Sequence, residues 1–147
     1  MTLLKLSIEL VPRTCFYKNL RAILSRTDWE KIRKQILLRT NNICEICSGK
    51  SINRTLDCHE TWEFDELTKT QKLKEIRGLC EKCHEVKHIG LAQLKGNFNR
   101  ARKHFININN ISEQEADELI RNAFLKWELL SKYNWNLDTT NVATFLK

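Results

Sequence analysis

Two Cys-x-x-Cys pairs constrain the fold of this chain more than any other feature. The first is Cys44/Cys47 and the second is Cys80/Cys83, with 32 residues between the pairs. Each pair places two sulfur atoms on one tight turn, so two pairs can complete a tetrahedral shell of four thiolates around Zn²⁺. Such a shell has no open coordination position, which predicts a structural zinc. Free thiols and disulfides are the alternatives that this spacing disfavours.

The N-terminal residues do not resemble a secretion signal. The run from Met1 to Val11 is partly apolar, but Lys5 and Glu9 interrupt it. Nowhere do about 18 apolar residues follow one another, so no membrane-spanning helix is expected. We therefore expect a cytoplasmic, intracellular protein that is not secreted and has no membrane partner.

The length of 147 residues and the hydrophobic fraction of 41% indicate one domain, or a compact domain with a helical extension. The net charge is +7, and the basic residues concentrate in two segments, 1–43 and 85–110. These segments flank a nearly neutral stretch. The distribution suits a polyanionic partner, although solvated surface lysines and arginines would produce the same pattern.

Helical and strand patterns alternate along the chain and predict an α+β fold. The strand patterns are residues 3–11, 55–64 and 76–79, and residues 65–74 read as a polar loop or short helical turn. Two capping boxes, Thr27 to Glu30 and Ser112 to Glu115, predict helix starts. Further helical patterns are residues 16–24, a helix from about Cys83 that could break near Gly90, and residues 91–106. Trp135 and Leu137 are expected to hold the C-terminal tail against the core.

A second group of potential ligands lies inside the window bounded by the cysteine pairs. His84 and His88 are four residues apart, so on a helix they share one face and can bind one metal ion. Cys58 and His59 are neighbours in a predicted strand, so their side chains point to opposite faces. One of these two can then bind the ion while the other has a different role. Cys15 and His104 have no partner at useful spacing and read as core and surface residues.

These residues resemble the motif of the HNH nucleases, also called the ββα-metal or His-Me finger superfamily. The matching stretches are Cys44-Glu-Ile-Cys47, Leu56-Asp57-Cys58-His59-Glu60 and Leu79-Cys80-Glu-Lys-Cys83-His84-Glu-Val-Lys-His88. The resemblance implies a small ββα-metal finger with a four-cysteine zinc site, embedded in flanking α-helices. It covers about residues 29–90 of a single domain 1–147, with an N-terminal extension 1–28 and a helical C-terminal extension 91–147.

The resemblance also implies an activity and a role for each matching residue. The chain is expected to be a metal-dependent endonuclease that hydrolyses phosphodiester bonds in DNA. His59 falls on the general base and His84 on a metal ligand, with Cys58 and/or His88 as further ligands. The second divalent ion would be Zn, Ni, Mn or Mg, and a thiolate at Cys58 would favour a soft ion.

Two positions depart from the family pattern. Cys58 stands where the family usually has Asp or His, and the middle Asn of the motif falls on Glu75. Asp57, Glu60 or Asp65 could orient the His59 imidazole instead, and the sequence leaves the choice open. The alternative function is therefore a catalytically degenerate zinc module that binds nucleic acid or a protein partner. A further option is a subunit that works only with a larger partner.

DNA is the expected partner, with RNA an open alternative. Basic residues near the motif are the candidate phosphate contacts. They are Arg77, Lys82, Lys87, Lys95, Arg100, Arg102 and Lys103.

Overall fold

A long β-hairpin lies at the centre of the molecule. This computed structural model describes residues 3–146 and has an α+β fold with a three-stranded sheet of order β1-β2-β3. Strand β1 (Asp57–Asp65) pairs antiparallel with β2 (Thr70–Leu79), and the short β3 (Asn136–Asp138) pairs parallel with β2. The α+β class is therefore confirmed.

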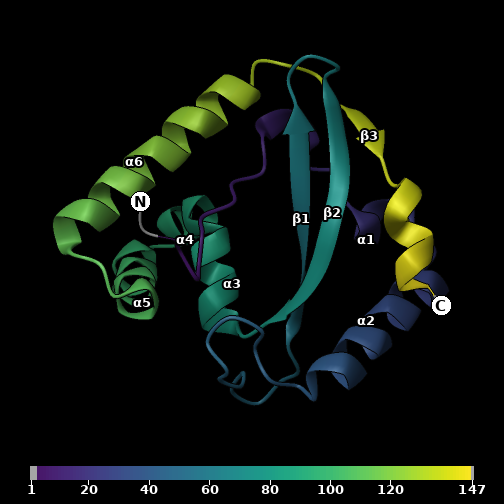
Figure 1. The fold of residues 1–147 in the computed structure, drawn as a ribbon, viewed down its shortest axis with the longest axis horizontal. Coiled ribbons are helices and arrows are strands. Elements are labelled where there is room, and N and C mark those ends of the chain that lie inside the picture. The colour runs from purple at the N-terminus through teal and green to yellow at the C-terminus, as the bar shows by residue number, and fades with distance from the viewer. Residues whose placement is uncertain (1–2, 147) are drawn as a thin grey trace.

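Helices cover both sides of the hairpin (Figure 1). They are η1 (Arg13–Cys15), α1 (Leu20–Ile23), α2 (Arg26–Thr40), α3 (Glu81–Lys87), α4 (Ile89–Leu94), α5 (Phe98–Asn109), α6 (Glu113–Leu130) and η2 (Thr140–Phe145). Helices α1, α2 and η2 lie on one side, whereas α3 to α6 lie on the other. Within residues 3–146, no helix is long and apolar enough to cross a membrane.

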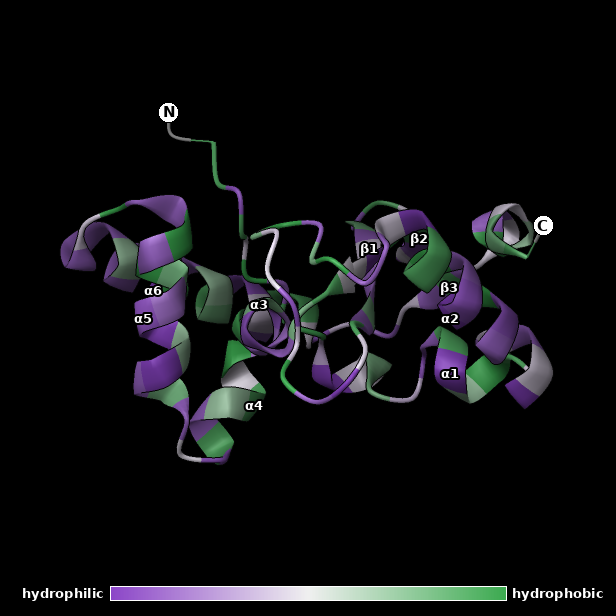
Figure 2. Cartoon of the chain, turned by 90° about the horizontal axis from the view of Figure 1, so that it is seen from below, coloured by the Kyte–Doolittle hydropathy of each residue, from purple (hydrophilic) through white to green (hydrophobic). Residues whose placement is uncertain are grey.

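Each side of the hairpin has its own hydrophobic core. Beside α2, Ile32 and Ile36 pack with Leu73 and Ile76 of the hairpin. The larger core on the other side gathers residues from α3, α5, α6 and the N-terminal segment. Figure 2 shows apolar and polar residues alternating along α5 and α6, as expected for helices with one buried face. Trp135 is buried against Cys15 and Leu130, which confirms that it holds the C-terminal tail.

Helix ends follow the capping rules, with one change. Ser112 caps α6 as predicted, and its hydroxyl accepts a hydrogen bond from the Glu115 amide at 3.0 Å. The predicted cap at Thr27 is wrong, because Ser25 caps α2 and accepts from the Asp28 amide at 3.1 Å. Both serine and threonine cap helices well, so two candidates that lie two residues apart compete, and Ser25, the earlier one, caps the helix.

The second strand is longer than its sequence predicts. It begins at Thr70, not Ile76, and includes residues expected to form a loop. Gln71 conceals the pattern, because it is fully buried although polar, and its amide nitrogen donates to the Lys18 carbonyl at 3.1 Å. A buried polar residue that binds a distant segment cannot be recognised from local alternation.

Two further local predictions need correction. Residues 3–11 form no strand, since the segment lies against α3 and the Glu9 amide donates to the Lys87 carbonyl at 3.1 Å. The helix carrying the histidines begins at Glu81, and it ends at His88, whose φ of −110° and ψ of 47° leave the helical region. The predicted break near Gly90 falls at His88, two residues earlier, and Gly90 lies inside the following helix α4.

Gly78 allows α2 to approach the hairpin closely. A Cβ atom at this position would lie 3.0 Å from both Ile36 Cγ2 and Leu56 Cδ1. We expect Gly78→Ala to lower the free energy of unfolding by about 1–3 kcal/mol, the usual cost of overpacking. At Gly90 a Cβ would lie 3.6 Å from Leu10 Cδ2, an ordinary contact, so Gly90→Ala should instead stabilise α4 by about 0.5–1 kcal/mol. Urea denaturation of both variants measures this difference in sign.

Candidate metal centres

The structure brings the four cysteines of the two pairs together. Their sulfur atoms lie within 4.8 Å of one another, and Cys47 Sγ is 3.6 Å from Cys80 Sγ. The first pair forms a tight loop in which the Ser48 amide donates to the Cys44 carbonyl and the Gly49 amide donates to Cys47 Sγ. The second pair spans the first turn of α3, where Cys80 is the N-cap. The predicted grouping of these cysteines is confirmed.

The electrostatics of this group favour a bound cation. Hydrogen bonds from the thiols of Cys80 and Cys83 lower the pKa of Cys44. The resulting thiolate raises the pKa values of Cys80 and Cys83, that of Cys80 to about 11. Four thiols at this distance cannot all ionise unless a cation balances their charge. The donor set and spacing fit a structural zinc ion.

His104 lies beside the cysteine group and is not the surface residue that its sequence context suggested. It comes from α5, its side chain is partly buried, and its Nε2 atom lies 3.3 Å from Cys83 Sγ. Hydrogen bonds of this kind orient metal ligands in many sites. His104 thereby connects α5 to the cysteine group.

A second group consists of three histidines at the contact between β1 and α3. His59, His84 and His88 each offer a ring nitrogen, and these atoms lie within 4.8 Å of one another. The ring centroid of His59 is 5.4 Å from that of His84 and 5.2 Å from that of His88. His84 of α3 and His88 at the C-cap of that helix therefore lie together as predicted, and His59 faces both.

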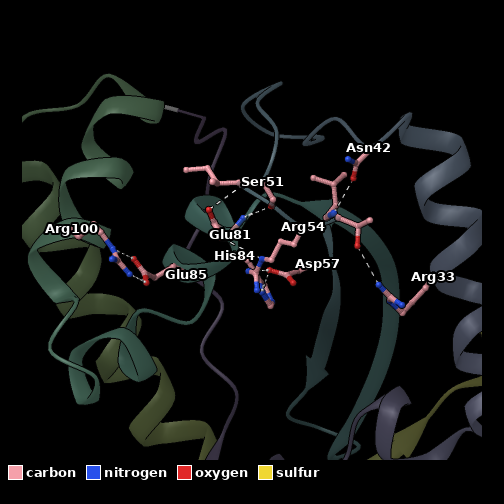
Figure 3. Close-up of polar contacts among 12 residues, drawn as sticks. Arg33, Asn42, Ser51, Arg54, Asp57, Glu81, His84, Glu85 and Arg100 are labelled. Carbon is pink, nitrogen blue, oxygen red and sulfur yellow. Dashed lines mark hydrogen bonds and ion pairs between the residues drawn. The ribbon is translucent and has the colours of Figure 1, made fainter.

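Two carboxylates contact this histidine group. Asp57 Oδ2 lies 3.2 Å from His84 Nδ1 and also pairs with Arg54 at 2.8 Å (Figure 3). Glu9 Oε1 lies 3.5 Å from His59 Nε2. The Asp57 contact engages Nδ1 of His84 and leaves Nε2 of that ring for a metal ion, an arrangement common around metal-binding histidines. Glu9 Oε1 faces His59 Nε2, but within the described residues neither atom has a hydrogen-bond partner.

Burial disfavours protonation of His59 and His88, so each ring keeps a lone pair. It lowers the pKa of His59 and lowers that of His88 to about 3, so both rings are neutral near pH 7. Burial opposes ionisation of Glu9 as well, but its contacts with His59 and Lys87 outweigh that effect and lower its pKa to about 2. A neutral imidazole next to an ionised carboxylate can bind a metal ion or accept a proton.

The structure does not bring Cys58 into the histidine group. Strand alternation places Cys58 on the opposite face of β1, where it packs against the core that contains Ile32 and Ile36. Burial there raises the pKa of its thiol to about 11. The expectation that Cys58 is a ligand is therefore corrected, because β1 turns His59 and Asp57 toward α3 instead.

None of the acidic residues considered from the sequence contacts His59. Glu75 lies 3.6 Å from Arg77, and Glu60 accepts a hydrogen bond from the Leu20 amide. Asp65 accepts from amides of the hairpin turn, and Asp57 contacts His84. Glu9 is the acidic residue that lies beside His59, and the sequence did not predict it. Its only signal was an acidic residue between the apolar Ile8 and Leu10, which does not indicate a partner 50 residues away.

A cleft of about 550 Å³ opens beside His84 and His88. Four basic residues line it, namely Arg54, Lys82, Lys95 and Arg100. Arg54 is paired with Asp57 and Glu81, and Arg100 with Glu85 (Figure 3). Lys82 and Lys95 are exposed and make no ion pair within the described residues.

The other predicted phosphate contacts lie elsewhere. Lys87 is 3% exposed and binds Glu9 and Ser7, so its assignment to a nucleic-acid surface is wrong. Arg102 pairs with Asp117 on α6. Arg77 and Lys103 are outside the cleft, whereas Arg54 lines it and was not among the predicted residues.

The site thus combines a closed four-cysteine group with an open three-histidine group beside a cleft. No protein-family model, no curated protein and no solved structure matches the chain. The function must therefore follow from the chemistry of these residues.

Proposed function

We propose that this protein is a metal-dependent endonuclease of the HNH type that hydrolyses phosphodiester bonds in DNA. The supporting observation is the group His59, His84 and His88, which joins a β-hairpin to the following helix and borders the cleft. In this proposal β1, β2 and α3 form the ββα-metal finger. The four-cysteine group binds a structural zinc that fixes the start of α3 relative to the hairpin.

His84 and His88 are the residues that would hold the catalytic ion. Asp57 orients His84 through its Nδ1 atom, so Nε2 of that ring is the free donor. A bound divalent ion would act as a Lewis acid at the phosphate and stabilise the negative charge that develops there. Lys82 and Lys95 would hold neighbouring phosphates by charge.

His59 would act as the general base. Its ring faces His84 and His88, and it is neutral near pH 7 because burial lowers its pKa. It can therefore accept a proton from a water molecule that attacks the phosphorus atom. Glu75 at the Asn position does not disfavour this role, because Glu9 contacts the imidazole instead.

The alternative function is a catalytically degenerate zinc module that binds nucleic acid or a protein partner. One observation favours it, because His59 is only 2% exposed and does not line the cleft. A base at this depth needs a water molecule within the histidine group.

Plasmid nicking with Mg²⁺, Mn²⁺, Ni²⁺ and Zn²⁺ tests the proposal. We expect cleavage with at least one metal and a loss of about 10²–10⁴-fold for His59→Ala, the usual contribution of a general base. Cys58→Ala is the matched control, since it changes the neighbouring residue on the opposite face of β1. Absence of cleavage with every metal would favour the non-catalytic module. Undiminished cleavage by His59→Ala would contradict the role of His59 as the general base. An RNA substrate in parallel identifies the nucleic acid.

The cleft lysines should contribute to affinity without sequence preference. We expect Lys82→Ala and Lys95→Ala each to weaken DNA binding and to reduce the slope of log K against log salt by about one. The control Lys34→Ala removes an exposed lysine from α2 on the far side of the hairpin and should change neither quantity. Fluorescence anisotropy across a salt series measures both. Equal effects for all three variants would place the DNA surface outside the cleft.

A further inference from the structure

The N-terminal segment fixes the position of Glu9 through its main chain. The Glu9 amide donates to the Lys87 carbonyl at 3.1 Å, at the end of α3. Three residues earlier, Leu6 exchanges two hydrogen bonds with the Asn109 side chain of α5. Glu9 is therefore placed beside the histidine group by contacts that do not involve its own carboxylate.

The Glu9 carboxylate lies between a buried cation and a buried imidazole. Its Oε2 atom accepts a hydrogen bond from Lys87 Nζ, which also donates to Ser7 Oγ at 3.0 Å. Its Oε1 atom lies 3.5 Å from His59 Nε2, and within the described residues both of these buried atoms have no hydrogen-bond partner. Lys87 thus holds one oxygen in place, and the other oxygen faces His59.

We propose that Glu9 is a positioning residue that keeps the proton of neutral His59 on Nε2. An ionised carboxylate can only accept hydrogen bonds, so the nitrogen that faces it must carry the proton. A neutral imidazole has one such proton, and Nδ1 is then left with a free lone pair. Within the proposed function, this lone pair is the base. The inference rests on that function only for its kinetic consequence, since the tautomer is a property of the chain itself.

Two double variants separate the acceptor from the buried charge. Glu9→Gln alone would leave Lys87 as a buried cation without its partner, so Lys87→Met accompanies each change. Glu9→Gln/Lys87→Met retains a carbonyl oxygen opposite His59. Glu9→Leu/Lys87→Met has similar volume and offers no acceptor. Circular dichroism and thermal melting establish that both variants fold, so the pair differs in the group that faces His59 Nε2.

Long-range ¹H–¹⁵N NMR of the zinc-loaded protein reads the tautomer directly. We expect His59 to carry its proton on Nε2 in the wild type and in Glu9→Gln/Lys87→Met. In Glu9→Leu/Lys87→Met, we expect the proton to move to Nδ1 or to exchange between the two nitrogens. A wild-type proton on Nδ1, or an unchanged tautomer in the leucine variant, would overturn the inference.

Kinetics supply a second reading. We expect kcat for DNA cleavage to fall about 10–100-fold in Glu9→Leu/Lys87→Met, the usual effect of removing a carboxylate that orients a histidine at a metal site. KM should be unchanged, because Glu9 is outside the cleft. A raised KM with unchanged kcat would contradict a positioning role. If no form of the protein cleaves DNA, the proposed function fails while the tautomer measurement still decides the role of Glu9.

Discussion

Cys80→Ala is expected to release the zinc ion that we propose for the four-cysteine group and to unfold the protein. Structural zinc binds with about 10–16 kcal/mol in small domains, whereas the total stability of a domain is about 5–15 kcal/mol. The group joins the loop after α2 to the N-terminus of α3, and the buried Cys44 and Cys83 belong to the larger core. Losing the ion would therefore separate the hairpin from the helix that carries the histidines. Zinc content per chain, thermal melting and circular dichroism with and without a chelator measure this effect.

Cys58→Ala provides the matched control for this experiment. It removes a partly buried thiol that belongs to neither metal-binding group. We expect its zinc content to equal that of the wild type and its free energy of unfolding to change by about 1 kcal/mol. The structural role of the cysteine group would be refuted by a Cys80→Ala protein with wild-type melting temperature. Loss of a metal ion in Cys58→Ala would restore Cys58 as a ligand.

Local signals predicted most of the fold, and long-range contacts account for the errors. The spacing of Cys-x-x-Cys and the Ser112 cap depend on a few neighbouring residues, and these predictions are confirmed. The N-terminal strand failed because its alternating pattern has no partner strand, and the segment binds α3 instead. Alternation predicts extended backbone, but only the tertiary fold supplies the partner for a strand.

In the candidate site, too, local sequence predicted some features, whereas others depend on long-range contacts. Alternation along β1 correctly opposed Cys58 and His59, and the four-residue spacing correctly paired His84 with His88. Glu9 and His104 reach their groups from segments distant in sequence, so no spacing rule links them to these groups. The contacts that tune the metal-binding residues therefore required the folded structure.

His84→Ala is expected to remove the proposed second metal ion and the proposed cleavage activity while the fold persists. His84 contributes one of the three clustered ring nitrogens, and it is partly exposed beside the cleft. Its loss removes a ligand without opening a cavity in the core. Metal catalysis supplies several kcal/mol of transition-state stabilisation, so we expect cleavage to fall by about 10³-fold or more. Metal analysis should give two ions per wild-type chain and one per His84→Ala chain.

Asp57→Asn and His59→Ala are the variants to compare with His84→Ala. Asp57 contacts His84 without belonging to the histidine group. Asp57→Asn should therefore lower the affinity for the second ion by about 10–100-fold without abolishing its binding. His59→Ala should retain that ion and lose only cleavage, because a general base is not needed to hold the metal. If His59→Ala instead loses the ion as fully as His84→Ala, then His59 is a third ligand. If His84→Ala keeps both ions, His84 is not a ligand of the second ion, and the assignment of that ion to His84 and His88 fails.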